Sequence, residues 1–130
     1  MPTSSDPRRA LGAHGERLAA EHLARAGMTI LERNFRTRLG ELDLIAADRS
    51  SIVFCEVKTR VVGRARGPAG PLDSIGPRKR RRLRTMAAEW LAKADASARV
   101  HRPELRFDAI GITLSRTGEL LALEHLENAF

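Results

Sequence analysis

Two short apolar segments, residues 40–47 and 52–59, follow each other with only a polar turn at 48–51 between them. The second segment is rich in β-branched and aromatic side chains, which are enriched in strands. Together the two segments predict a β-hairpin, around which the rest of the chain is organised. The second strand also carries Glu56 and Lys58, and burying a charged side chain costs free energy unless it is paired or binds something.

The register of this hairpin predicts where its acidic residues lie. A symmetric, even-numbered turn centred between Arg49 and Ser50 pairs Asp43 with Glu56, and it pairs Glu41 with Lys58. An odd-numbered turn would remove this pairing. Directly opposite Cβ atoms lie about 4.5–5.5 Å apart in an antiparallel pair, so two carboxylates there repel each other unless a cation lies between them. A hard divalent ion such as Mg²⁺ suits carboxylate oxygens, and the hairpin therefore predicts a metal site.

Side chains alternate along a strand, which places Asp43, Glu56 and Lys58 on one face of the hairpin. For Glu41 the sequence leaves three alternatives: ligation of the metal, pairing with Lys58, or contact with solvent. Because Glu41 lies opposite Lys58 in the predicted register, we favour the ion pair.

The strings Gly40-Glu41-Leu42-Asp43-Leu44-Ile45 and Phe54-Cys55-Glu56-Val57-Lys58-Thr59-Arg60 resemble the YraN-like bacterial proteins. This largely uncharacterised family is assigned to the PD-(D/E)XK nuclease superfamily, which has the restriction-endonuclease-like fold. Asp43 matches the first acid of that motif and Glu56-Val57-Lys58 matches its Glu-x-Lys. The resemblance covers nearly the whole chain, from Gly15-Glu16 to Ala129-Phe130.

The resemblance implies a metal-dependent nuclease that hydrolyses phosphodiester bonds in DNA. It implies Asp43, Glu56 and Lys58 as catalytic residues, and Mg²⁺ or Mn²⁺ held by Asp43, Glu56 and the carbonyl of Val57. It also implies that Glu16 completes the metal cluster, because related resolvase-type nucleases use an acid on the first helix. The helical pattern itself, which ends at Gly27, places Glu16 on the row that faces the sheet, where it could instead be a fringe residue whose carboxylate reaches water.

The chain carries a formal charge of +7, which favours a polyanionic partner, with nucleic acid first and an anionic membrane surface second. Only three of its 23 basic residues are lysine, and Lys79 extends the apolar stripe of a predicted helix, 77–94, toward the sheet. The alternative for the remaining basic residues is a solvated surface. The residues expected to bind nucleic acid are Lys79, Arg60, Arg36, Arg38, Arg78, Arg81 and Arg82.

The predicted architecture is an α/β domain with a restriction-endonuclease-like core, in which a small mixed β-sheet is flanked by helices. The expected order is helix, three strands, helix, two strands, with a disordered leader at 1–9 and a single domain at 10–130. Residues 60–76 are rich in glycine and arginine and predict a mobile basic loop. The last two strands, 105–114 and 120–123, predict a hairpin in which Arg106 and Asp108 share a face.

Several features narrow the class of protein. The chain lacks an apolar run of the ~20 residues that cross a bilayer, and its first residues lack the apolar centre of a secretory signal, so we expect a cytoplasmic protein without membrane insertion. Cys55 is the only cysteine, and the four histidines show no metal-ligand spacing with it.

Aromatic residues make up only 4% of the chain, which disfavours base stacking and favours recognition of the backbone and shape of branched or irregular DNA.

Two other functions compete with the nuclease. The first is a non-catalytic nucleic-acid-binding module that keeps the nuclease fold, and the second is a basic adaptor for an anionic lipid surface or an acidic protein. A homodimer is a further expectation from the resemblance, since related resolvases act as pairs, but the sequence specifies no interface.

Overall fold

The computed structural model describes residues 7–63, 76–94 and 104–130 of the chain. The elements follow in the order α1 (Pro7–Arg25), β1 (Thr29–Thr37), β2 (Gly40–Ala47), β3 (Ser51–Val61), α2 (Pro77–Lys93), β4 (Glu104–Leu114) and β5 (Leu120–Leu126). This order confirms the predicted α/β architecture of helix, three strands, helix and two strands. Neither helix of the described segments is long and apolar enough to cross a lipid bilayer.

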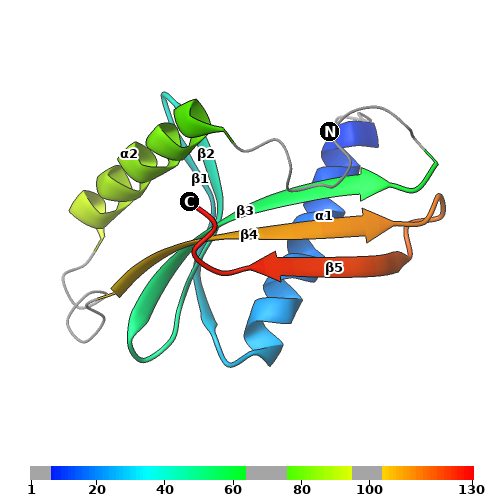
Figure 1. The fold of residues 1–130 in the computed structure, drawn as a ribbon, viewed down its shortest axis with the longest axis horizontal. Helices are drawn as coiled ribbons and strands as arrows, with labels where there is room; N and C mark the ends of the chain where they lie inside the picture. The colour runs from blue at the N-terminus through cyan, green and yellow to red at the C-terminus, as the bar shows by residue number, and fades with distance from the viewer. Residues whose placement is uncertain (1–6, 64–75, 95–103) are drawn as a thin grey trace, which may run out of the picture.

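The strands form one five-stranded sheet in the order β1-β2-β3-β4-β5. Neighbouring strands are antiparallel except β3 and β4, which run parallel, so the sheet is mixed. A parallel pair needs a crossover connection, and α2 lies in the connection between β3 and β4. Figure 1 shows α1 crossing behind β3, β4 and β5, while α2 lies at the end of the sheet occupied by β1 and β2.

Alternation along β3 divides the hydrophobic core between the two helices. Val53 and Cys55 face α1 and belong to one buried cluster, whereas Ile52 and Phe54 face α2 and belong to another. The Phe54 ring meets the Trp90 ring of α2 edge-on, with 5.8 Å between centroids. The apolar stripe predicted for the second helix is therefore correct: Leu83, Met86, Ala87 and Trp90 are all buried.

The boundaries of several elements differ from the prediction, and β5 runs to Leu126 where the predicted strand ended at 123. The first helix begins at Pro7, so residues 7–9 are helical and do not belong to a leader. The third strand continues to Val61, which puts Arg60 in a strand, whereas a loop starting at 60 was predicted. The remainder of the predicted leader and most of the predicted loop, at 64–75, lie outside the described residues.

Candidate metal centre

The β2–β3 hairpin has the predicted register, because its printed pairs run from Ala47 opposite Ile52 to Leu44 opposite Cys55. The turn is fixed by the Asp48 carboxylate, which accepts hydrogen bonds from the backbone N–H groups of Ser50 at 2.9 Å and Ser51 at 2.8 Å. Beyond Leu44 the regular pairing stops. There the Asp43 carboxylate replaces a backbone partner and accepts the Val57 N–H at 2.8 Å.

Asp43 and Glu56 are both buried, each with 9% of its surface exposed, and their side chains hydrogen-bond to each other. Burial first, and then the charges of Glu56 and Glu16, together raise the pKa of Asp43 to about 8 against the lowering effect of the Val57 N–H. Near neutral pH this carboxyl therefore keeps a proton or requires a nearby cation.

Glu16 reaches the same place from α1. A Cβ added at Gly15 would collide with the Thr59 hydroxyl, so glycine at this position lets α1 lie directly against β3. Carboxylate oxygens of Glu16, Glu41 and Asp43 lie within 4.8 Å of one another, which is close enough to hold one metal ion. The predicted helix face of Glu16 therefore does point toward the acids.

Glu41 overturns one prediction. It was expected to pair with Lys58, but its carboxylate contacts the Arg36 guanidinium at 3.4 Å and accepts a hydrogen bond from the Asn34 side chain at 3.1 Å. The side chain leaves the predicted partner because the regular β2–β3 pairing ends at Leu44, so alternation across the hairpin no longer fixes its direction. Glu41 thereby joins the acidic group of Glu16 and Asp43.

Asn34 is a site residue that the sequence did not reveal. Its amide donates to Glu16 at 2.9 Å as well as to Glu41 at 3.1 Å, and so it holds two acids from different elements side by side. Its backbone is left-handed, with φ of 53°. Asparagine tolerates this conformation better than most residues, but the sequence around Asn34 gave no sign of it.

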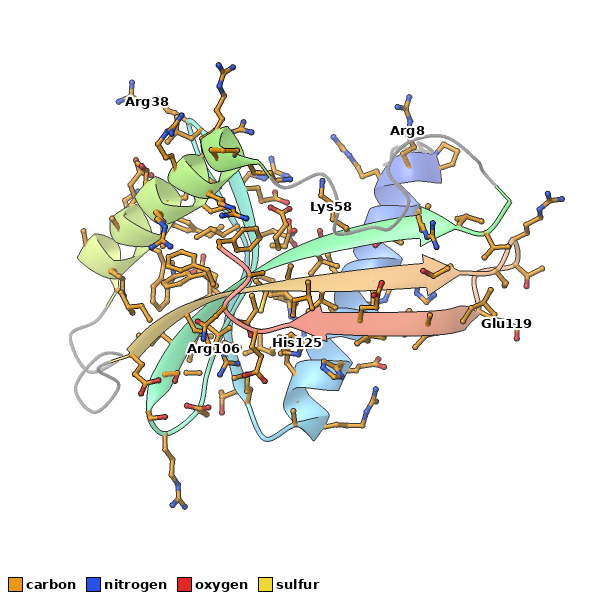
Figure 2. All side chains as sticks on the ribbon, viewed as in Figure 1. Arg8, Arg38, Lys58, Arg106, Glu119 and His125 are labelled. Atoms are coloured by element: carbon orange, nitrogen blue, oxygen red, sulfur yellow. The ribbon has the colours of Figure 1, made fainter. Side chains whose placement is uncertain are left out.

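The two lysines complete the site on its cationic side. The Lys79 ammonium of α2 lies 3.4 Å from a Glu56 carboxylate oxygen. The Lys79 ammonium lies close to that of Lys58, and this contact, followed by burial, lowers the pKa of Lys58 although Glu56 and Asp43 raise it. Figure 2 shows Lys58 projecting from β3 toward the side where α2 begins.

Two cavities flank the acids. One, of about 280 Å³, lies between the β2–β3 hairpin and α2, and the other, of about 260 Å³, lies between α1 and β3. Glu41, Asp43, Glu56, Lys79 and Arg82 are among the residues that line the first cavity, and Arg8, Glu16, Val57 and Lys58 are among those that line the second. Acidic and basic side chains thus meet at both cavities.

The other predicted nucleic-acid contacts are spread over a wider surface. Arg78 and Arg81 are exposed on α2. Arg36, with 82% of its side chain exposed, and Arg38 line a groove of about 600 Å³ together with Lys93 of α2. Arg60 is exposed on β3, where its Nε donates to the Thr113 hydroxyl of β4 at 3.4 Å. Of the predicted arginines, only Arg82 lines the cavity that contains Asp43 and Glu56.

Comparison with known proteins places the chain among bacterial relatives. The sequence model of "Uncharacterised protein family UPF0102" matches residues 15–112. A "UPF0102 protein" of Acidothermus cellulolyticus is 44% identical, with all of both chains covered. A namesake from Rhodococcus opacus is 45% identical over 93% of this chain and 96% of its own, and one from Mycolicibacterium smegmatis is 46% identical over 90% of each.

Proposed function

The chain belongs to the protein family UPF0102, and from the geometry of its acidic site we propose that it is a metal-dependent nuclease that cuts phosphodiester bonds in DNA. Membership in this family agrees with the resemblance to YraN-like proteins. One observation carries the proposal: a buried aspartate, Asp43, is surrounded by the carboxylates of Glu16, Glu41 and Glu56. Such a group is unfavourable unless a cation or a proton neutralises part of its charge.

The donor set fits a hard divalent cation. Carboxylate oxygens suit Mg²⁺ and Mn²⁺, and the oxygens of Glu16, Glu41 and Asp43 already converge within 4.8 Å. We assign Asp43, Glu56, the Val57 carbonyl and Glu16 as the residues that hold the ion, with Glu41 as an addition from the structure. When bound, such an ion polarises a phosphoryl oxygen and lowers the pKa of a bound water.

The remaining chemistry belongs to the lysines. Lys58 orients the attacking water and stabilises the negative charge that develops on the phosphate, as a fixed donor placed beside the reacting group. Lys79 binds a neighbouring phosphate oxygen, because its ammonium lies beside both Glu56 and Lys58 at the wall of the 280 Å³ cavity. The two lysines therefore form the cationic side of the site.

The substrate follows from the surface around the site. Arg78, Arg81 and Arg82 project from the start of α2, and Arg36 and Arg38 project from the end of the β1–β2 hairpin. Arginines of this kind bind phosphates and set the position of the DNA without reading its bases. With few aromatic residues for base stacking, recognition rests on backbone and shape, which suits branched or irregular DNA.

The test is cleavage of branched, nicked and single-stranded DNA by the purified protein in Mg²⁺ or Mn²⁺. We expect Glu56→Ala to lower the cleavage rate by about 100-fold or more, a loss typical of removing one group that stabilises the transition state. Glu119→Gln, an exposed change in the β4–β5 turn, is the matched control and should cleave as the wild type does. Equal cleavage by wild type and Glu56→Ala would contradict the site assignment.

A second candidate, a non-catalytic DNA-binding module, is favoured by the Lys79–Glu56 ion pair. This contact supplies one acid of the site with a cation from the protein itself. The same experiment separates the two functions. A protein that cuts none of the substrates, yet binds DNA with an affinity that falls steeply as salt rises, would be the binding module.

A further inference from the structure

A leucine stands at the tip of the β1–β2 hairpin, where protein turns normally carry glycine, proline, asparagine, aspartate or serine. Thr37 pairs with Gly40, so Arg38 and Leu39 form the turn between the two strands. The Leu39 side chain is exposed. Among the described residues, those that form or pack against the two hydrophobic clusters do not include Leu39, so core packing does not account for this side chain.

The position of Leu39 distinguishes it from the other exposed apolar side chains. Six large hydrophobic residues of the described segments are exposed. Of these six, only Leu39 lines the 280 Å³ cavity that also contains Asp43 and Glu56. Whatever the two acids bind in this cavity therefore lies next to an apolar side chain.

The turn is fixed by its own hydrogen bonds and by α2. The Thr37 hydroxyl accepts the Leu39 N–H at 3.0 Å and donates to the Gly40 carbonyl at 3.2 Å. Gly40 has a φ of 135°, which glycine adopts readily, and a Cβ added there would lie 4.0 Å from the Met86 sulfur of α2. The hairpin tip thus lies against the helix. A side chain that is already positioned loses little conformational entropy when it binds.

Cationic side chains surround the tip. Arg38 is the neighbour of Leu39 in the turn and Arg36 precedes it in β1, and both are exposed. Figure 2 shows Arg38 projecting outward from this end of the hairpin. Arg82 of α2 lines the same cavity as Leu39. Proteins that kink DNA combine these two kinds of residue, because an apolar side chain enters between base steps while arginines contact the surrounding DNA.

We propose that Leu39 is a wedge that enters an interrupted base stack next to the phosphate at the acidic site, and that it thereby selects nicked or branched DNA over intact duplex. This inference rests on the proposed function, because it needs DNA at that site. Separating stacked bases costs free energy, and the cost is smallest where a nick or branch has already broken the stack. Burial of the exposed Leu39 side chain between the bases then offsets the remaining cost.

The first test measures base unstacking and needs no cleavage. A nicked duplex carries 2-aminopurine beside the nick, and the fluorescence of this base rises when it loses its stacking partner. With Ca²⁺ in place of Mg²⁺, we expect saturating wild type to raise the fluorescence and Leu39→Ser not to raise it. Leu39→Met keeps an apolar tip and should act as the wild type does. Leu121→Ser changes an exposed leucine of β5 and is the matched control. An equal rise with wild type and Leu39→Ser, or no rise with the wild type, would overturn the proposal.

The second test measures selectivity as the ratio of cleavage rates in Mn²⁺ on nicked duplex and on single-stranded DNA of the same sequence. We expect Leu39→Ser to lower this ratio about tenfold or more, the effect of losing the burial of one leucine side chain. Leu39→Met and Leu121→Ser should keep the ratio. An unchanged ratio in Leu39→Ser would overturn the wedge and leave the nuclease in place. Absence of cleavage by the wild type would contradict the proposed function instead, and the fluorescence test alone would then decide on the wedge.

Discussion

Asp43 and Asp108 are two aspartates buried in the same sheet, and the protein treats them in opposite ways. Asp108 is fully buried and is surrounded by donors: the Arg106 guanidinium at 2.9 Å, the His125 ring at 2.8 Å and the Asn128 N–H at 3.0 Å. Asp43 accepts one backbone N–H, at 2.8 Å from Val57, and its other neighbours include three acids. Figure 2 shows Arg106 and His125 close together and apart from Lys58.

The difference separates a carboxylate that the fold itself neutralises from the carboxylate that we propose binds a metal. The contacts of Asp108 join β4 to β5 and to the C-terminal segment, so its charge is neutralised by the fold itself. The charge of Asp43 is not neutralised in this way. An energetically unfavourable cluster of acidic side chains is typical of sites that bind cations. Removing the charge should therefore destabilise the protein at Asp108 and stabilise it at Asp43.

The largest expected effect is on folding at Asp108. Asp108→Asn takes the fully buried anion from the half-buried Arg106 and leaves it the more exposed Glu127, 3.5 Å away, as its anionic partner. Breaking a buried ion pair from one side costs about 3–5 kcal/mol. Urea denaturation at pH 7 measures the loss of unfolding free energy. Glu119→Gln, an exposed change, should stay within about 0.5 kcal/mol of the wild type. A loss at Asp108 no larger than that of Glu119→Gln would remove the contrast between the two aspartates.

The next effect is a pH dependence that comes from Asp43. The pKa of Asp43 is about 8 in the folded protein, whereas the ordinary pKa of an aspartate is 3.8. Between pH 3.8 and about 8 the folded chain therefore binds a proton that the unfolded chain has released. Its contribution to stability is complete below about pH 4 and is lost as pH rises through about 8. In metal-free buffer at pH 9, Asp43→Asn should therefore be more stable than the wild type by at least about 1.4 kcal/mol, the value of one pKa unit.

The control for this prediction is built into the same titration. The stability difference between Asp43→Asn and wild type should shrink steadily as the pH falls from 9 to 5. Denaturation curves at each pH measure it, with a chelator present throughout. A difference that stays constant over this range would mean that Asp43 does not titrate inside the site as described.

The smallest effect concerns the two asparagines with left-handed backbones, one in each region. Asn34→Gly keeps the backbone conformation but removes the amide that holds Glu16 and Glu41, so Mn²⁺ affinity should fall about fivefold, the equivalent of one hydrogen bond of ~1 kcal/mol. Asn128→Gly is the matched control, because only its backbone N–H contacts Asp108. Equal losses of Mn²⁺ affinity in the two variants would exclude a positioning role for Asn34.

The sequence predicted those parts of the site that depend on regular strand geometry. The turn at Asp48–Ser51 sets the β2–β3 register, and the helical row of Glu16 sets its direction toward the sheet. The pairing of Arg106 with Asp108 was likewise predicted, because residues two apart share a face of a strand.

The parts that the sequence did not predict lie where regular geometry ends. Glu41 precedes the last regular pair of β2 and β3, so alternation assigned it the wrong partner. Asn34 reaches the site through a left-handed residue in an edge strand, and His125 reaches Asp108 from the part of β5 beyond the strand predicted at 120–123. Contacts of this kind depend on the path of the backbone in space, which a local pattern of residues does not contain.

Titration calorimetry with Mn²⁺ at pH 7.5, on the wild type and on Asp43→Asn, tests most directly whether the acidic group around Asp43 is a metal site. We predict that the wild type binds Mn²⁺ and that Asp43→Asn, although folded and at least as stable, loses this binding. Equal binding by both proteins, or binding by neither, would contradict a metal centre at Asp43.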